Sequence, residues 1–439
     1  MFLIIAMPIF FSYFCIMKHD ATYMRNLLCA MFVALFLLPV PALRSQIMRD
    51  TVLNADIKTV TLYRNGVELE QPVIHMGTSD RLMLQFDLLS AQPATFRYRI
   101  VHCNRNWEAD SLEPFDYISG FEDGSIDNYR SSFTTLQDYN HYHQLIPAQY
   151  TTFTASGNYV LAVYPQEYPD SVVMLRRFMV SEDVVEVEAA VARPTNAADI
   201  MRYQELSVAL AFKSVATGHQ YLHVMAMQNG RVDLLRELPF NGFSGNRLLY
   251  RYADANVFAG GNCFRYFDIS NMRTTMYNVQ RIEQYGGELF AFLKPDESRA
   301  RSNYAPIQSL NGGMKTNVWD RHDPQVEADY VWVNFSLPLE RPFIDGTVHV
   351  VGALTDWSLG EQSRMEWKPQ YKAYTKRMLL KQGYYSYQLL FLPTGSGEAL
   401  TATLEGDHAA NPNRYTVMVY QRQPSDRYDR LLAVVITGK

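Results

Sequence analysis

Two histidines at positions 141 and 143 have the spacing that comes closest to a metal site. On a β-strand, residues two apart point to the same face, so His141 and His143 could hold a zinc ion between two imidazoles. No further ligand lies at a suggestive spacing, and the alternative is one packed and one solvated histidine. His102 and Cys103 are adjacent, so on a strand they face opposite sides and cannot share one ion without distortion. We therefore expect no metal and no other cofactor.

Side chains suited to catalysis are abundant, but none of them forms a recognisable constellation. The chain has no G-x-S-x-G nucleophile elbow, no H-E-x-x-H zinc motif and no phosphate-binding loop. Asp87, Glu113 and Asp116 could form an acid–base pair, or they could be solvated loop acids. A hydrolase built on β-domains has no motif support, and we predict a protein that is not an enzyme.

The composition favours β-structure and weakens the case for nucleic-acid binding. Among 439 residues, aromatic side chains make up 13%, with 29 Tyr and 24 Phe, and charged side chains make up 19%. Aromatic residues fit the pleated, half-buried surface of a sheet, and such richness argues against intrinsic disorder. The net charge of −5 leaves no basic surplus to neutralise phosphates, so we expect no nucleic-acid partner.

The first 45 residues are typical of a leader that does not belong to the fold. Two apolar runs, 2–17 and 27–43, are each shorter than the ~20 residues of a membrane-spanning helix. The second run follows a short basic segment and ends in small and helix-breaking residues, as a secretory signal peptide does. We predict a signal peptide over 24–45, cleaved after Ser45. The first run is then either an over-extended start before Met24 or part of a two-segment anchor.

Export would leave two cysteines, Cys103 and Cys263, in the mature chain. An exported protein with two cysteines can form one disulfide. Because the strand pattern places them in different domains, two buried free thiols are the favoured alternative. The mature chain has no further long apolar run, so we predict that it either stays in the periplasm or leaves the cell.

Alternation of apolar and polar residues recurs along the rest of the chain. Segments such as 57–63, 95–101 and 158–164 have the period of two that predicts strands. We predict an all-β fold of three consecutive, immunoglobulin-like β-sandwich domains. The predicted bounds are 48–181 for the N-terminal domain, 182–297 for the middle domain, 298–327 for a linker or long loop, and 328–439 for the C-terminal domain.

Several unusual local signatures follow one another along the chain. They are His102-Cys103-Asn104-x-x-Trp107, Tyr117-x-x-Gly120-Phe121, His141-Tyr142, Ser156-Gly157-Asn158, Val351-Gly352-x-Leu354-Thr355-x-Trp357, Lys381-Gln382-Gly383, Leu404-Glu405-Gly406-Asp407-His408 and Arg427-x-Asp429-Arg430-Leu431. In this order and spacing, the chain resembles the type IX secretion system plug protein family of Bacteroidota over nearly all of residues 50–439. The family more often has Asp at the position of Asn104, and Asn at the position of Thr134.

The resemblance implies a periplasmic subunit of a protein-export system, associated with the outer membrane through its partner. Such a plug docks on the outer-membrane translocon barrel, seals the periplasmic opening of that barrel, and is not an enzyme. The motif residues then serve the structure or the partner interface. Trp107, for example, is either an exposed contact residue at a partner surface or a side chain at the edge of the core.

The last domain supports an alternative function. The stretch from Val351 to Trp357 also resembles early-set immunoglobulin-like modules, which include glycogen- and starch-binding modules. There, a tryptophan in the position of Trp357 can stack on a sugar ring, and Trp367 or Tyr374 could supply a second platform. The protein could therefore be a periplasmic or surface carbohydrate-binding protein instead.

Overall fold

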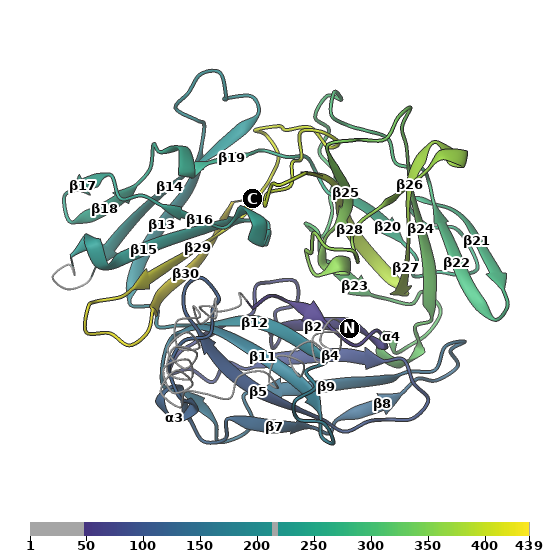
Figure 1. The fold of residues 1–439 in the computed structure, drawn as a ribbon, viewed down its shortest axis with the longest axis horizontal. Coiled ribbons are helices and arrows are strands. Elements are labelled where there is room, and N and C mark those ends of the chain that lie inside the picture. Colours follow the sequence, from purple (N-terminus) through teal and green to yellow (C-terminus); the bar gives the residue numbers. More distant parts are fainter. Residues whose placement is uncertain (1–47, 213–217, 439) are drawn as a thin grey trace, which may run out of the picture. The chain divides into compact units, whose positions relative to one another are not determined.

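The computed structural model describes residues 48–212 and 218–438, and strands dominate it (Figure 1). The described residues form one compact unit. The predicted leader and its signal peptide lie outside the described residues. Within the described residues, no helix is long and apolar enough to cross a membrane. The predicted all-β class with sandwich domains is confirmed.

The N-terminal sandwich consists of two sheets that enclose one apolar core. The first sheet comprises β1 (Thr51–Val52), β12 (Met174–Ser181), β11 (Gly157–Pro165), β5 (Phe96–Cys103) and β7 (Asp123–Ile126), with β3 (Val73–His75) parallel to β12. The second sheet comprises β2 (Ile57–Arg64), β4 (Leu82–Leu88), β9 (Asn140–Ile146) and β8 (Tyr129–Ser131). Alternate residues of β4, such as Leu84 and Phe86, meet Ile100 and Leu161 of the first sheet in the core, as the period of two requires.

Two short strands and one helical turn complete this sandwich. They are α3 (Pro114–Tyr117), β6 (Ile118–Ser119) and β10 (Thr152–Phe153), and β6 pairs with β10.

The middle sandwich combines strands from two distant parts of the sequence. One sheet comprises β13 (Val185–Ala192), β14 (Tyr203–Phe212), β18 (Arg247–Tyr250), β17 (Gly242–Ser244) and β19 (Val257–Ala259). The other comprises β16 (Arg236–Leu238), β15 (Leu222–Gln228), β29 (Arg414–Gln421) and β30 (Arg430–Gly438). Figure 1 shows the yellow strands β29 and β30 beside the teal strand β15.

The third sandwich encloses a separate apolar core. One sheet comprises β21 (Val279–Tyr285), β22 (Glu288–Leu293), β24 (Tyr330–Pro338), β27 (Ala373–Lys381) and β26 (Glu366–Lys368). The other comprises β20 (Arg265–Asp268), β28 (Gly383–Pro393), β23 (Met314–Thr316) and β25 (Gly346–Val351). The short helix α4 (Pro324–Glu327) precedes β24.

Strand pairing departs from the consecutive bounds expected from the sequence. Strands β20 and β22 fall within the span 182–297 but pair with β28 and β24 of the third sandwich. Strand β29, in contrast, pairs with β15, and β30 pairs with β29. The span 298–327, expected to be a linker, contributes β23 to the sheet around β28. We therefore propose that residues 182–260 and 409–438 form the middle domain, and that 262–408 form the third.

Candidate functional site: two interdomain joints and a cavity

His102 lies in a joint between the N-terminal sandwich and the turn before β30. The imidazole is buried, and its Nδ1 is hydrogen bonded to the carboxylate of Asp110. Its Nε2 lies 3.1 Å from the carbonyl oxygen of Ser156, and its ring packs edge-on against Tyr428 at 5.3 Å. Both ring nitrogens are therefore engaged inside the protein.

The Ser156 hydroxyl connects the N-terminal sandwich directly to β30. It donates a hydrogen bond to Glu182 at 2.7 Å and accepts one from the backbone N–H of Leu431 at 3.0 Å. Glu182 is in turn paired with the guanidinium of Arg430 at 2.6 Å. Ser156 and Leu431, 275 positions apart, thus bring their two motifs together in one hydrogen-bond network.

Gly157 must be a glycine because of this joint. Its φ is +143°, and a Cβ there would lie 2.6 Å from His102 Nε2 and 3.3 Å from the carbonyl oxygen of Asp429. The missing side chain therefore allows the close approach of the two segments.

Asn158 and Asp429 add further bonds across the same joint. The Asn158 amide donates to the carbonyl oxygen of Asn104 at 3.0 Å and accepts from the Tyr420 hydroxyl at 2.8 Å. Asp429 is buried and pairs with Arg105 at 3.2 Å. The Asn158 amide and the Asp429 carboxylate are thus satisfied by partners within the protein, whereas Arg105 Nε is buried with no hydrogen-bond partner among the described residues.

Cys103 and Trp107 belong to the apolar part of the joint, which also contains Met227, Met418 and Leu431. Burial raises the pKa of the Cys103 thiol to about 12, which keeps the sulfur in its protonated form near neutral pH. Trp107 is 7% exposed, and the guanidinium of Arg177 lies over its ring at 4.5 Å. The structure thus places Trp107 at the edge of a core. Cys103 and Cys263 are both free and buried.

A second joint connects the N-terminal sandwich to the third sandwich through the buried carboxylate of Asp87. Its oxygens accept hydrogen bonds from Lys381 Nζ at 2.6 Å and the Tyr330 hydroxyl at 2.7 Å, and one lies 2.7 Å from His141 Nδ1. Burial alone would raise the pKa of Asp87, but the charge of Lys381 and the bond to His141 outweigh it and hold the pKa below its usual value.

Neighbouring contacts complete the second joint. Lys381 Nζ also donates to the carbonyl oxygen of Gln325 at 2.7 Å and lies 4.2 Å from the ring centroid of Tyr139. The backbone N–H of Leu136 donates to Asp329 at 2.6 Å. Asp87 and Lys381 are 294 positions apart, so their spacing in the sequence does not indicate that they form a pair.

The possible zinc pair of His141 and His143 has a different role in the structure. His141 is occupied by Asp87, and the ring centroids of the two histidines are 6.3 Å apart in a stacked arrangement. Within the described residues, no three or more His, Cys, Asp or Glu side chains gather as a metal site would require.

Of the three acids considered for an acid–base pair, Asp87 lies apart from the other two. Asp87 is in the second joint, whereas Asp116 and Glu113 form the capping box of α3. Arg427 binds Asp116 at 2.8 Å, and this hydrogen bond lowers the pKa of Asp116.

The remaining motif residues of the N-terminal sandwich divide into core and surface. Tyr117 and Tyr142 are buried, with their hydroxyls bonded to Ile100 and Ala94 carbonyl oxygens at 2.9 and 2.7 Å. The side chain of Phe121, in contrast, is 68% exposed.

Gly120 determines how the loop of Phe121 lies. A Cβ on Gly120 would lie 2.5 Å from the carbonyl oxygen of Tyr150, and its φ is +113°. The Phe121 N–H is hydrogen bonded to Thr151 Oγ1 at 3.1 Å. Gly120 therefore allows the two loops to touch, with the exposed rings of Phe121 and Tyr150 on them.

Trp357 is half-buried and lines a cavity. Its ring packs edge-on against Phe264 at 6.0 Å and fills the space beside Gly312. The two residues considered as a second sugar platform, Trp367 and Tyr374, pack against each other at 5.2 Å at the third core. These three rings therefore do not form the pair of exposed platforms that sugar stacking needs.

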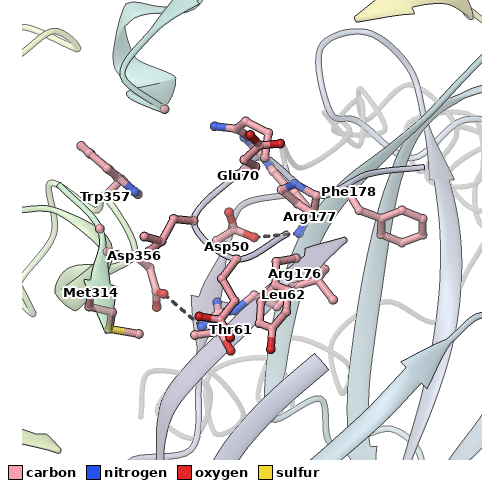
Figure 2. Close-up of a pocket in the computed structure, with 18 of the residues that line it drawn as sticks. Asp50, Thr61, Leu62, Glu70, Arg176, Arg177, Phe178, Met314, Asp356 and Trp357 are labelled. Atoms are coloured by element: carbon pink, nitrogen blue, oxygen red, sulfur yellow. Dashed lines mark hydrogen bonds and ion pairs between the residues drawn. The ribbon is translucent and has the colours of Figure 1, made fainter. Parts of the chain in front are cut away.

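The cavity lies where β2, β12, β23 and the β15–β29 sheet come together (Figure 2). Its volume is about 490 Å³. Arg176 on β12 pairs with Asp356 of the third sandwich at 3.0 Å, and Asp50 accepts the backbone N–H of Arg177 at 2.7 Å. The motif residue Trp357 and the joint residue Trp107 both line it.

Comparison with known proteins identifies the family. The sequence profile described as Type 9 secretion system plug protein 1st domain matches residues 57–182, which is the N-terminal sandwich. A crystal structure of a hypothetical protein from Parabacteroides merdae is similar with a TM-score of 0.87 and 30% sequence identity, covering 90% of this chain and 100% of that chain. The chain belongs to the type IX secretion system plug protein family. No curated protein matches the sequence.

Membership gives the protein a role related to type IX secretion. Plug-domain proteins are non-catalytic components of the secretion system, and they are associated with the periplasm and the cell envelope. The profile covers only the N-terminal sandwich. The similarity to the Parabacteroides merdae protein also covers the middle and third sandwiches.

Proposed function

We propose that this plug-family protein docks on the outer-membrane translocon barrel from the periplasmic side and closes its opening when no substrate is in transit. Family membership carries this proposal. The protein acts as a binding subunit and not as an enzyme, and it needs no cofactor, nucleic acid or small-molecule substrate.

The two joints support the proposal physically. A body that blocks a wide pore must resist separation of its parts, and buried bonds between sandwiches provide that resistance. Ser156, Gly157 and Asn158 join the N-terminal sandwich to β29 and β30. Asp87 and Lys381 join it to the third sandwich. In this interpretation, most motif residues serve to hold the plug together.

We place part of the barrel-contacting surface at the exposed rings beside Gly120. Phe115, Phe121 and Tyr150 are 79%, 68% and 84% exposed, and they lie on α3 and on the two touching loops. Exposed aromatic residues are enriched among those that dominate binding at protein interfaces. A specific contact would bury at least about 1,000 Å² in total.

Copurification tests the proposal. The tagged full-length protein, expressed in its native envelope and cross-linked before detergent extraction, should bring down the outer-membrane barrel. The double variant Phe121→Ala with Tyr150→Ala should recover at least about tenfold less barrel, because loss of two hot-spot residues costs 2 kcal/mol or more. Tyr285→Ala removes an equally exposed ring, 81% exposed, from the last residue of β21 and serves as the matched control.

A wild-type protein that never recovers the barrel would refute docking. Recovery that is equal for the double variant and the control would refute only the placement of the surface.

A further inference from the structure

Strand β2 is the edge of its sheet, and its outer side lines the cavity. It pairs with β4 alone, and Val60, Thr61, Leu62 and Tyr63 all line the cavity. In the part of the chain that the structure describes, no backbone group outside β4 bonds to the N–H or C=O groups of these four residues. An unpaired edge of this kind can accept another strand.

The hydroxyl of Thr61 is a second sign that something is missing here. Thr61 Oγ1 is buried and has no hydrogen-bond partner among the described residues. It lies at the irregularity of β2, where the register with β4 shifts between Lys58 and Thr61. An unmet buried hydroxyl costs free energy, which an arriving N–H or C=O recovers once the atoms that now cover Oγ1 move aside.

The opposite wall of the cavity contains a further free edge. Strand β23 pairs with β28 on one side, and Met314, Lys315 and Thr316 line the cavity. The cavity is therefore bounded by extended backbone on two sides.

Charge and shape limit what the cavity can hold. Its lining contains equal numbers of acids and bases, namely Asp50, Glu68, Glu70 and Asp356 against Arg176, Arg177, Lys315 and Arg414. Four of these form ion pairs, Arg176 with Asp356 at 3.0 Å and Arg414 with Glu70 at 3.9 Å. Such a balanced lining does not favour a strongly charged ligand, whereas an uncharged polypeptide segment with apolar side chains fits it.

We propose that this cavity binds an extended peptide segment of a partner protein, which adds as a strand to the free edge of β2. The segment is uncharged and rich in β-forming residues, so that its backbone bonds to Val60–Tyr63 and its side chains contact the walls. A volume of about 490 Å³ is within the usual range of binding cavities. The site does not depend on docking to the barrel, because the cavity residues are distinct from Phe115, Phe121 and Tyr150.

A labelled peptide tests this site directly. The probe is fluorescein-Thr-Val-Thr-Val-Thr-Val-Thr-amide, added to the complete mature protein and followed by fluorescence anisotropy and amide hydrogen exchange. We expect saturable binding and slower exchange at 60–63, with unchanged exchange at β21, an edge strand that does not line the cavity. Because strand addition is recognised through the backbone, the same peptide with alternate N-methyl groups should not bind. Absence of binding up to about 1 mM, or binding that leaves 60–63 unprotected, overturns the proposal.

Two variants relate the binding to the cavity. Thr61→Val removes the unmet hydroxyl without changing the volume, so it should melt at or above the wild-type temperature but bind the peptide about two- to tenfold more weakly. Lys315→Trp places a large ring at an exposed cavity position and should weaken binding at least tenfold with an unchanged melting temperature. Wild-type affinity in both folded variants contradicts binding at this site.

Discussion

Replacing Lys381 by methionine should destabilise the protein strongly, because it leaves a buried carboxylate without its cation. Lys381 Nζ is 2.6 Å from Asp87 Oδ2, and the two side chains are 0% and 1% exposed. Breaking a buried pair by removing one partner costs about 3–5 kcal/mol, far more than the pair itself contributes. Methionine retains the length and most of the volume, so the loss reports mainly on charge.

Urea unfolding followed by tryptophan fluorescence measures this cost. Lys368→Met is the matched control, since Lys368 pairs with Glu366 at 2.6 Å in the same sandwich but is 40% exposed. Exposed pairs contribute about 1 kcal/mol or less, so we expect a small change. The double variant Asp87→Asn with Lys381→Met removes both charges and should lose less than Lys381→Met alone.

Two results would refute this reasoning. One is a loss for Lys381→Met within about 1 kcal/mol of the control, because the pair would then be effectively solvated. The other is a double variant as unstable as the sum of the two single changes, since uncoupled residues add.

Two further predictions concern other buried groups. Gly157→Ala should destabilise the protein by about 3 kcal/mol in thermal melts, because the new Cβ would overlap His102. Gly66→Ala is the control: its φ is +86°, but no atom lies within 4 Å of the new Cβ, so it should cost only about 1–2 kcal/mol. Burial lowers the pKa of His349 to about 4, below the 6.5 expected when it is unfolded, so the unfolded state binds more protons as the pH falls from 7 to 5. Stability should then drop by up to about 1–2 kcal/mol over this range, and His349→Gln should flatten that part of the profile; an unchanged slope would contradict a buried, neutral imidazole.

Local features of the fold could be predicted from the sequence. The period of two in 95–101 and 158–164 indicates strands, and the structure has β5 and β11 there. His141 and His143 lie two residues apart on β9, and their rings stack as the spacing allows. The spacing could not show that His141 is hydrogen bonded to Asp87.

The assembly of the strands could not be predicted in the same way. Nothing in the alternation of 415–420 indicates that β29 pairs with the distant strand β15 as well as with its sequence neighbour β30. Each strand is compatible with any sheet that buries its apolar face. Contacts such as Ser156 with Leu431 depend on that assembly. Motif resemblance marked these residues as important, yet only the structure shows that segments far apart in the sequence form one joint.

The most direct test of the central claim is the conductance of the purified translocon barrel in a planar bilayer. Adding the mature protein to the periplasmic side should close the large open-pore conductance at stoichiometric concentrations, and adding it to the opposite side should not. A barrel that conducts equally with and without saturating, stably bound protein would contradict a plugging function.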